Sequence, residues 1–92
     1  MYRFKKMKGI KLTYEMQGLI FFSCRTINKQ SIAKQNKIKE LCMNIAGEDA
    51  KALLEVLTTD TSILQIAQKN FVPEKKLYQL RKSFYEEFAR YL

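Results

Sequence analysis

Apolar residues recur along this chain at the spacing of an α-helix, and this period restricts what the chain can fold into. The spacing i, i+3, i+4, i+7 is shown most clearly by Ile38, Leu41, Cys42 and Ile45. Such a pattern places one apolar stripe against a core, which predicts helices rather than strands. Because the pattern returns several times within 92 residues, we expect an all-α fold, a small bundle of about five helices.

Capping residues predict where the first three helices begin and end. We expect Thr13 to cap the first helix and Ser31 the second, which should end at Gly47 in a left-handed conformation. Glu48 and Asp49 follow at once. Since acidic side chains stabilise the positive N-terminal end of a helix, these two residues predict the start of a third helix.

Two more helices are predicted after residue 59. Asp60 or Thr61 can cap a short fourth helix. Pro73 has the backbone angle that a first helical turn needs and favours an extended residue before it, so a fifth helix should start there. The apolar stripe of this last helix consists of Leu77, Leu80, Phe84, Phe88 and Tyr91.

The chain before the first helix, residues 1–12, is a basic arm with five positive charges and no negative one. We expect a solvated terminus or, because some of its apolar residues alternate, a short strand. The apolar run from Leu19 to Phe22 fits either a helix or a buried strand, and we expect the helix. Residues 13–92 are then a single domain.

Charge and residue usage narrow the possible functions. The net charge of +8 fits a polyanionic partner, either nucleic acid or an anionic membrane surface. Histidine is absent and only Cys24 and Cys42 are present, so no Cys/His metal cage and no histidine-based catalysis can be assembled. None of the carboxylates lies beside a metal motif or a glycine-rich loop. We therefore expect no enzyme, no metal and no cofactor.

The two cysteines and the apolar runs also bear on location. Thiols outside a CxxC pair or a dense cysteine framework are typical of core residues in a reducing compartment. The apolar run that precedes Cys24 is short and follows Glu15 and Gln17, which argues against a secretion signal. No run approaches the roughly 20 apolar residues of a membrane span. We expect a cytoplasmic protein that does not enter a membrane.

Residues 62–82 resemble a helix-turn-helix, in which a short helix, a tight turn and a second helix keep a fixed spacing. Ala67 takes the place of the small residue that lets the helices approach, and Val72 fills the turn. Leu77 and Leu80 take the places of the two inward leucines. Any hairpin of helices that cross steeply gives the same pattern, so a simple bundle stays open as an alternative.

The turn departs from the usual motif at one position. Phe71 stands where glycine is common. Because phenylalanine fits a left-handed backbone poorly, we expect a wider or differently shaped turn.

If the second helix enters DNA, the residues between its inward positions face the nucleic acid. These candidates are Glu74, Lys75, Lys76, Tyr78, Gln79 and Lys82. Glutamine can hydrogen-bond adenine, lysine suits guanine edges or phosphates, and tyrosine can reach a phosphate or stack. Charged residues opposite an apolar stripe are also what any solvated helix shows.

From Ile32 onward, a lysine-rich helix, the ALLEVL helix and the SILQIA and VPEKKLYQLRKSF pair resemble the C-terminal region of phage late-gene transcription regulators of the ArpU-like family. That family is itself similar to region four of sigma factors. The resemblance implies a sequence-specific DNA-binding transcription regulator from a phage or other mobile element. It also implies a promoter as the double-stranded DNA target and contact with RNA polymerase.

A second hypothesis is a small helical protein-interaction module without specific DNA recognition. The C-terminal aromatic and apolar residues bear on this choice because one helix stripe cannot bury all of them. They are Phe84, Tyr85, Phe88, Tyr91 and Leu92. Some of them either form a homodimer interface or wrap around the first helix.

Overall fold

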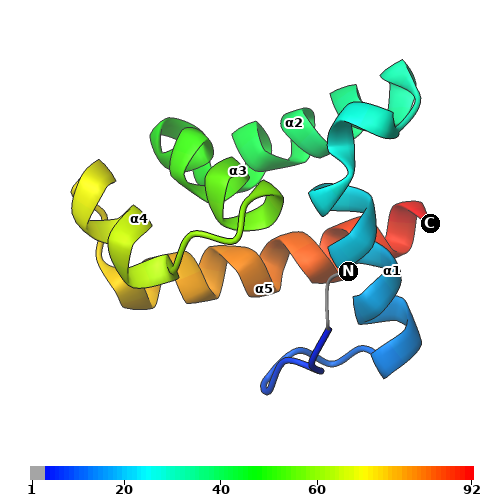
Figure 1. The fold of residues 1–92 in the computed structure, drawn as a ribbon, viewed down its shortest axis with the longest axis horizontal. Helices are drawn as coiled ribbons and strands as arrows, with labels where there is room; N and C mark the ends of the chain where they lie inside the picture. Colours follow the sequence, from blue (N-terminus) through cyan, green and yellow to red (C-terminus); the bar gives the residue numbers. More distant parts are fainter. Residues whose placement is uncertain (1–3) are drawn as a thin grey trace.

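The computed structural model describes residues 4–92, and the secondary structure in this range is helical with no strand. The α-helices are α1 (Tyr14–Arg25), α2 (Ile32–Ala46), α3 (Ala50–Thr58), α4 (Ile63–Asn70) and α5 (Glu74–Tyr91). Short 3-10 helices lie at Ile27–Lys29 and Gly47–Asp49. The predicted all-α class and its five helices are therefore confirmed for the described residues. In Figure 1, α5 runs along the molecule below α2 and α3, and α4 lies at its N-terminal end.

The first two helices begin at the predicted caps. The Thr13 hydroxyl accepts a hydrogen bond from the Met16 amide at 3.1 Å, and the Ser31 hydroxyl accepts one from the Lys34 amide at 3.2 Å. Each bond satisfies one of the amides that the first turn of a helix leaves without a partner. The apolar run at residues 19–22 lies within α1, as the helical interpretation predicted.

The start of α4 corrects one predicted cap. Neither Asp60 nor Thr61 caps it; Ser62, with an extended backbone, accepts a hydrogen bond from the Gln65 amide at 3.2 Å. The Asp60 carboxylate instead pairs with Arg25 of α1. The cap falls on the residue that directly precedes the helix, because only there can a side chain reach the third amide.

The passage from α2 to α3 also differs from the prediction. Gly47 has a positive φ of 56°, but its ψ of −118° lies outside the left-handed helical region. A 3-10 helix occupies Gly47–Asp49, so α3 begins at Ala50 rather than at the acidic pair. The Asp49 side chain does not cap α3; it bonds to Lys76 of α5.

Two clusters of buried residues form the core, and α5 contributes to both. The large core contains Ile10, Ile20, Cys24, Ile38, Leu41, Cys42, Ala50, Leu53, Leu57, Phe84, Tyr85 and Phe88. The small core contains Ala52, Val56, Ile66, Ala67, Val72 and Leu77. Leu80 packs against both. The first half of α5 thus packs with α3 and α4, and the second half packs with α1, α2 and α3.

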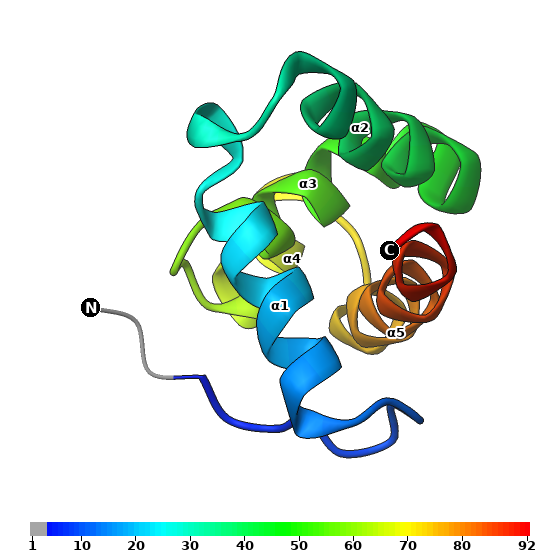
Figure 2. The same ribbon diagram turned by 90° about the vertical axis from the view of Figure 1, so that its right-hand side faces the viewer.

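The arm is neither a solvated tail nor a strand in its described part, residues 4–12. Ile10 is buried in the large core, and the fully buried Gln17 of α1 hydrogen-bonds to the arm backbone. Figure 2 shows the arm on the side of α5 opposite α2. The part of the basic arm that contains Tyr2 and Arg3 lies outside the described residues.

Candidate nucleic-acid interface

The small core packs the N-terminal half of α5 against α3 and α4. Ala67 is buried where α4 meets its neighbours, and Leu77 is fully buried on α5. Val72 fills the turn, and its amide donates to the Ala67 carbonyl at 3.0 Å. The α3 helix completes this unit with two further buried side chains. The N-terminal half of α5 is therefore braced from behind, while its opposite face is left exposed.

The turn between α4 and α5 is tight, which corrects the expectation of a wider one. Phe71 adopts the left-handed conformation itself, with φ 56° and ψ 41°. The backbone bonds to the Ala67 carbonyl and the burial of Val72 hold it there. The Phe71 ring is 95% exposed, so no side-chain packing opposes this conformation. An aromatic side chain is thus presented to solvent beside the start of α5.

The structure places all six predicted site residues on the surface, but it does not bring them all together. Lys75, Gln79 and Lys82 follow the spacing i, i+4, i+7 and form one row along α5. Tyr78 is half-exposed beside this row. Within residues 4–92, neither Lys75 nor Lys82 has a carboxylate partner. This row combines free positive charge with an amide that can both donate and accept hydrogen bonds.

Two lysines of the same unit are engaged within the protein. The Lys76 ammonium lies 2.5 Å from the Asp49 carboxylate, and this hydrogen bond raises the pKa of Lys76. The Lys69 ammonium of α4 lies 2.5 Å from the Glu55 carboxylate of α3, and this hydrogen bond lowers the pKa of Glu55. Lys76 therefore faces the 3-10 helix before α3 and lies apart from the exposed row.

Arg81 is a candidate that the sequence pattern missed. Its guanidinium carbon lies 5.2 Å from the centroid of the Tyr78 ring. Its Nε is buried without a hydrogen-bond partner among the described residues, and burial lowers the pKa of Arg81. Arg81 lies one turn beyond Leu77 at the edge of the buried stripe, a position that the apolar spacing alone does not single out. The spacing i, i+3 of Tyr78 and Arg81 in the sequence indicates that the two side chains can stack.

The C-terminal aromatic residues are divided between core and surface. Phe84, Tyr85 and Phe88 are buried in the large core together with residues of α1 and α2. They are therefore unavailable to a second copy of the chain. Tyr91 and Leu92 remain half-exposed, and Lys37 of α2 lies over the Tyr91 ring at 4.9 Å from its centroid. In the described part of the chain, these two are the exposed large apolar residues at this end of α5.

Comparisons with protein-family models, with curated proteins and with solved structures found no match for the chain. In the described part of the chain, no group of three acidic, cysteine or histidine side chains is arranged to hold a metal ion. A search of the same residues found no helix with the length and apolarity that crossing a membrane requires. What the site offers chemically is positive charge and hydrogen-bonding groups on a braced helix.

Proposed function

We propose that the protein binds double-stranded DNA through α5 and is a sequence-specific transcription regulator. The observation that carries this proposal is the exposed row of Lys75, Gln79 and Lys82 on a helix braced by the small core. A helix enters the major groove when neighbouring helices support it from behind. The net charge of +8 supplies the attraction that DNA binding needs.

In this proposal the residues of α5 divide into two roles. Lys75 and Lys82 neutralise phosphates, which orients the protein without reading the sequence. Gln79 lies between them and hydrogen-bonds a base edge, preferably adenine. Tyr78, stacked against Arg81, contacts the backbone at the edge of the groove. Lys76 and Glu74 lie to the sides of the row. Lys76 can bind a phosphate only if its ion pair with Asp49 breaks.

A salt titration of binding to a random 30-base-pair duplex tests this proposal by fluorescence anisotropy. Lys75→Gln combined with Lys82→Gln removes two phosphate contacts, so the slope of log K against log salt should fall by about 1.8. The matched control combines Lys29→Gln with Lys39→Gln, exposed lysines outside the helix-turn-helix, and should leave the slope unchanged apart from a small effect of net charge. Equal affinities for the two double variants and the wild type would refute binding through α5.

Sequence specificity is tested separately, on a site selected from a pool of random duplexes. Gln79→Ala should cost about 1–3 kcal/mol on the selected site and little on random DNA. Failure of the selection to enrich any sequence would leave a DNA-binding protein without specific recognition. An equal loss of affinity on both kinds of DNA would indicate that Gln79 contacts the DNA backbone rather than a base.

The remaining parts of the proposal rest on the resemblance to the phage regulators. They are an origin in a phage or mobile element, a promoter as the target, contact with RNA polymerase and a cytoplasmic location. A homodimer would use Tyr91 and Leu92, because the other C-terminal aromatic residues are buried. Co-purification of RNA polymerase and sizing by light scattering test the two protein partners.

A protein-interaction module is the second candidate, and two exposed apolar features favour it. Phe71 is almost fully exposed at the turn. A largely apolar hollow of about 280 Å³ lies between α2 and α3, beside the exposed Met43. If the α5 variants leave DNA binding unchanged while Phe71→Ala abolishes a protein complex, this second function replaces the first.

A further inference from the structure

We infer that the arm is a second DNA-backbone contact, which Gln17 holds in place beside α5. This inference rests on the proposed function, because it adds a contact to the same complex. It concerns the exposed lysines of the described arm, which are Lys5, Lys6, Lys8 and Lys11.

The first step is that the arm backbone has a defined shape. The fully buried Gln17 accepts a hydrogen bond from the Met7 amide at 2.8 Å. Its amide nitrogen lies within hydrogen-bond distance of the Ile10 carbonyl at 3.3 Å and the Leu12 carbonyl at 3.2 Å. One side chain thus closes residues 7–12 into a loop. If the loop moved away, the buried side-chain amide of Gln17 would lose its hydrogen-bond partners, which costs free energy. These hydrogen bonds therefore hold the loop against α1.

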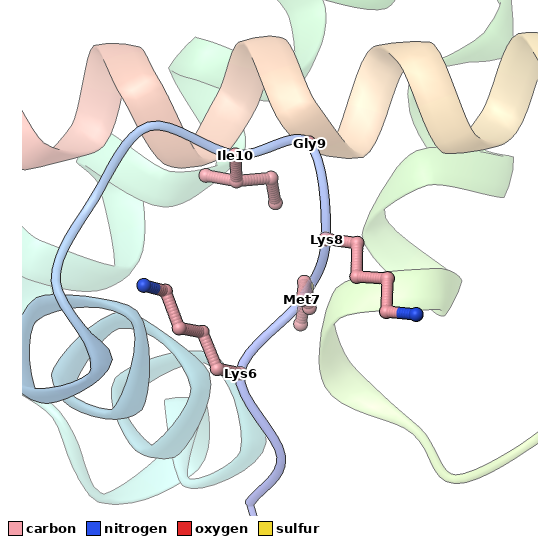
Figure 3. Close-up of a pocket in the computed structure, with 5 residues that line it drawn as sticks. All are labelled: Lys6, Met7, Lys8, Gly9 and Ile10. Carbon is pink, nitrogen blue, oxygen red and sulfur yellow. The ribbon is translucent and has the colours of Figure 1, made fainter.

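The second step is that this loop lies beside the DNA-binding face proposed for α5. Ile10 and Tyr85 belong to the same cluster of twelve buried residues; Figure 2 shows the loop below α5, and Figure 3 shows Gly9 and Ile10 in front of it. Side chains three, four and seven residues apart lie on the same side of a helix. Tyr78, Arg81 and Lys82 precede Tyr85 at those intervals. The loop is therefore a neighbour of the side of α5 that carries these three residues.

The third step is the charge of the loop. The segment from residue 4 to residue 12 carries four lysines and no carboxylate, and none of these lysines forms an ion pair within the described chain. Lys6 and Lys8 line a hollow of about 370 Å³ together with Met7, Gly9 and Ile10. Figure 3 shows the Lys6 ammonium turned into the loop and the Lys8 side chain turned away from it. The loop therefore carries positive charge on its inner and its outer side.

These three steps point to the phosphate backbone as the partner of the arm. When a helix occupies the major groove, about 12 Å wide, phosphates line both edges of the groove beside it. A basic element that runs alongside the helix meets those phosphates. Because Gln17 fixes the loop before DNA arrives, the lysines bind without the entropy cost of ordering a free tail.

Three double variants with the same change of charge test the inference in the salt titration described above. Lys6→Gln with Lys8→Gln should lower the slope by about 1.8, which corresponds to an affinity loss of about sixtyfold at 0.1 M salt relative to 1 M salt. The Lys29→Gln and Lys39→Gln control should retain the wild-type slope. If the arm variant binds as the control does while the α5 variant is impaired, the arm inference is wrong and the proposed function stands. If all three bind as the wild type does, both fail.

Gln17 is a positioning residue, and its test uses a double-mutant cycle. Gln17→Met removes the hydrogen bonds to the loop while keeping a side chain of similar length. It should weaken DNA binding in the wild type but add little in the Lys6→Gln, Lys8→Gln background, because the contact that it positions is already lost. An equal loss in both backgrounds would show a purely structural role. Circular dichroism should first establish that the Gln17→Met variants in both backgrounds are folded.

An anionic membrane is the other polyanion that the arm lysines could meet. Binding of the same variants to vesicles containing phosphatidylserine is measured in parallel with DNA binding. Unchanged DNA affinity together with lost vesicle binding in the arm variant would overturn the inference in favour of a membrane surface. Loss of DNA affinity in that variant supports it.

Discussion

Replacing Phe71 by glycine is expected to stabilise the protein, although the change removes a large apolar side chain. The left-handed conformation of this residue costs a non-glycine residue about 1–2 kcal/mol. Because the ring is 95% exposed, its removal gives up almost no burial. Glycine loses about 0.5–1 kcal/mol more backbone entropy on folding. The difference leaves a net stabilisation of about 0.75 kcal/mol, the middle of a range from about 0 to about 1.5 kcal/mol.

Phe71→Ala is the matched control, because it removes the ring but keeps the Cβ that opposes the left-handed backbone. Urea unfolding followed by circular dichroism should give Phe71→Ala about the wild-type stability and Phe71→Gly a higher midpoint with the same slope. A gain of this size corresponds to a melting temperature several degrees higher, at about 4–8 °C per kcal/mol. A glycine variant less stable than the wild type would refute the reasoning. So would an alanine variant that loses more than about 1 kcal/mol, because the ring would then be packed.

Three further predictions concern the core and the chain end. Ala67→Glu should lower the free energy of unfolding by about 3 kcal/mol or more, because it buries a charge between helices. The control Gln68→Glu, on the exposed side of α4, should change the melting temperature little. Equal melting temperatures of the two variants would place Ala67 on the surface. Phe88→Ala should lower the free energy of unfolding in urea by about 3–5 kcal/mol, because the ring is fully buried. Tyr91→Ala should leave the fold intact and, if a homodimer forms at that residue, should lower the mass measured by light scattering. Burial raises the pKa of both cysteine thiols to about 12, so alkylation at pH 8 should be slow until urea is added. The free energy of unfolding should fall as the pH rises above about 9, because only the unfolded thiols release protons there. Rapid labelling of the folded protein or a flat pH profile would contradict this.

The helices were predictable because their signals are local. Periodic apolar residues and capping hydroxyls at Thr13 and Ser31 act within one or two turns of the chain, so the sequence alone carries them. The errors lie at helix ends where several residues compete. At the start of α4 three successive polar residues could all cap; Ser62 does so because it directly precedes the helix, while Asp60 pairs with Arg25 of α1.

The candidate site was predictable only in part. The exposure of the α5 row follows from its helical period. The pairing of Lys76 with Asp49 joins residues far apart in the chain, so no local sequence pattern predicts it. The same holds for Gln17, whose bonds to a loop backbone have no periodic signature. Phe71 was misjudged because general backbone preferences were applied to a position where neighbouring contacts outweigh a cost of about 1–2 kcal/mol.

Because α5 contributes side chains to both cores, a tilt of this helix would change the packing of both. Its 18 residues extend over about 27 Å, with one end beside the turn at Phe71 and the other at the chain end near Lys37 of α2. A tilt of about 5° around the far end displaces the near end by about 2 Å, more than the range of lengths over which a hydrogen bond persists. If a molecule bound at Tyr91 and Leu92 tilted α5 by this angle, Gln79, about 18 Å from that end, would move by about 1.6 Å without being touched.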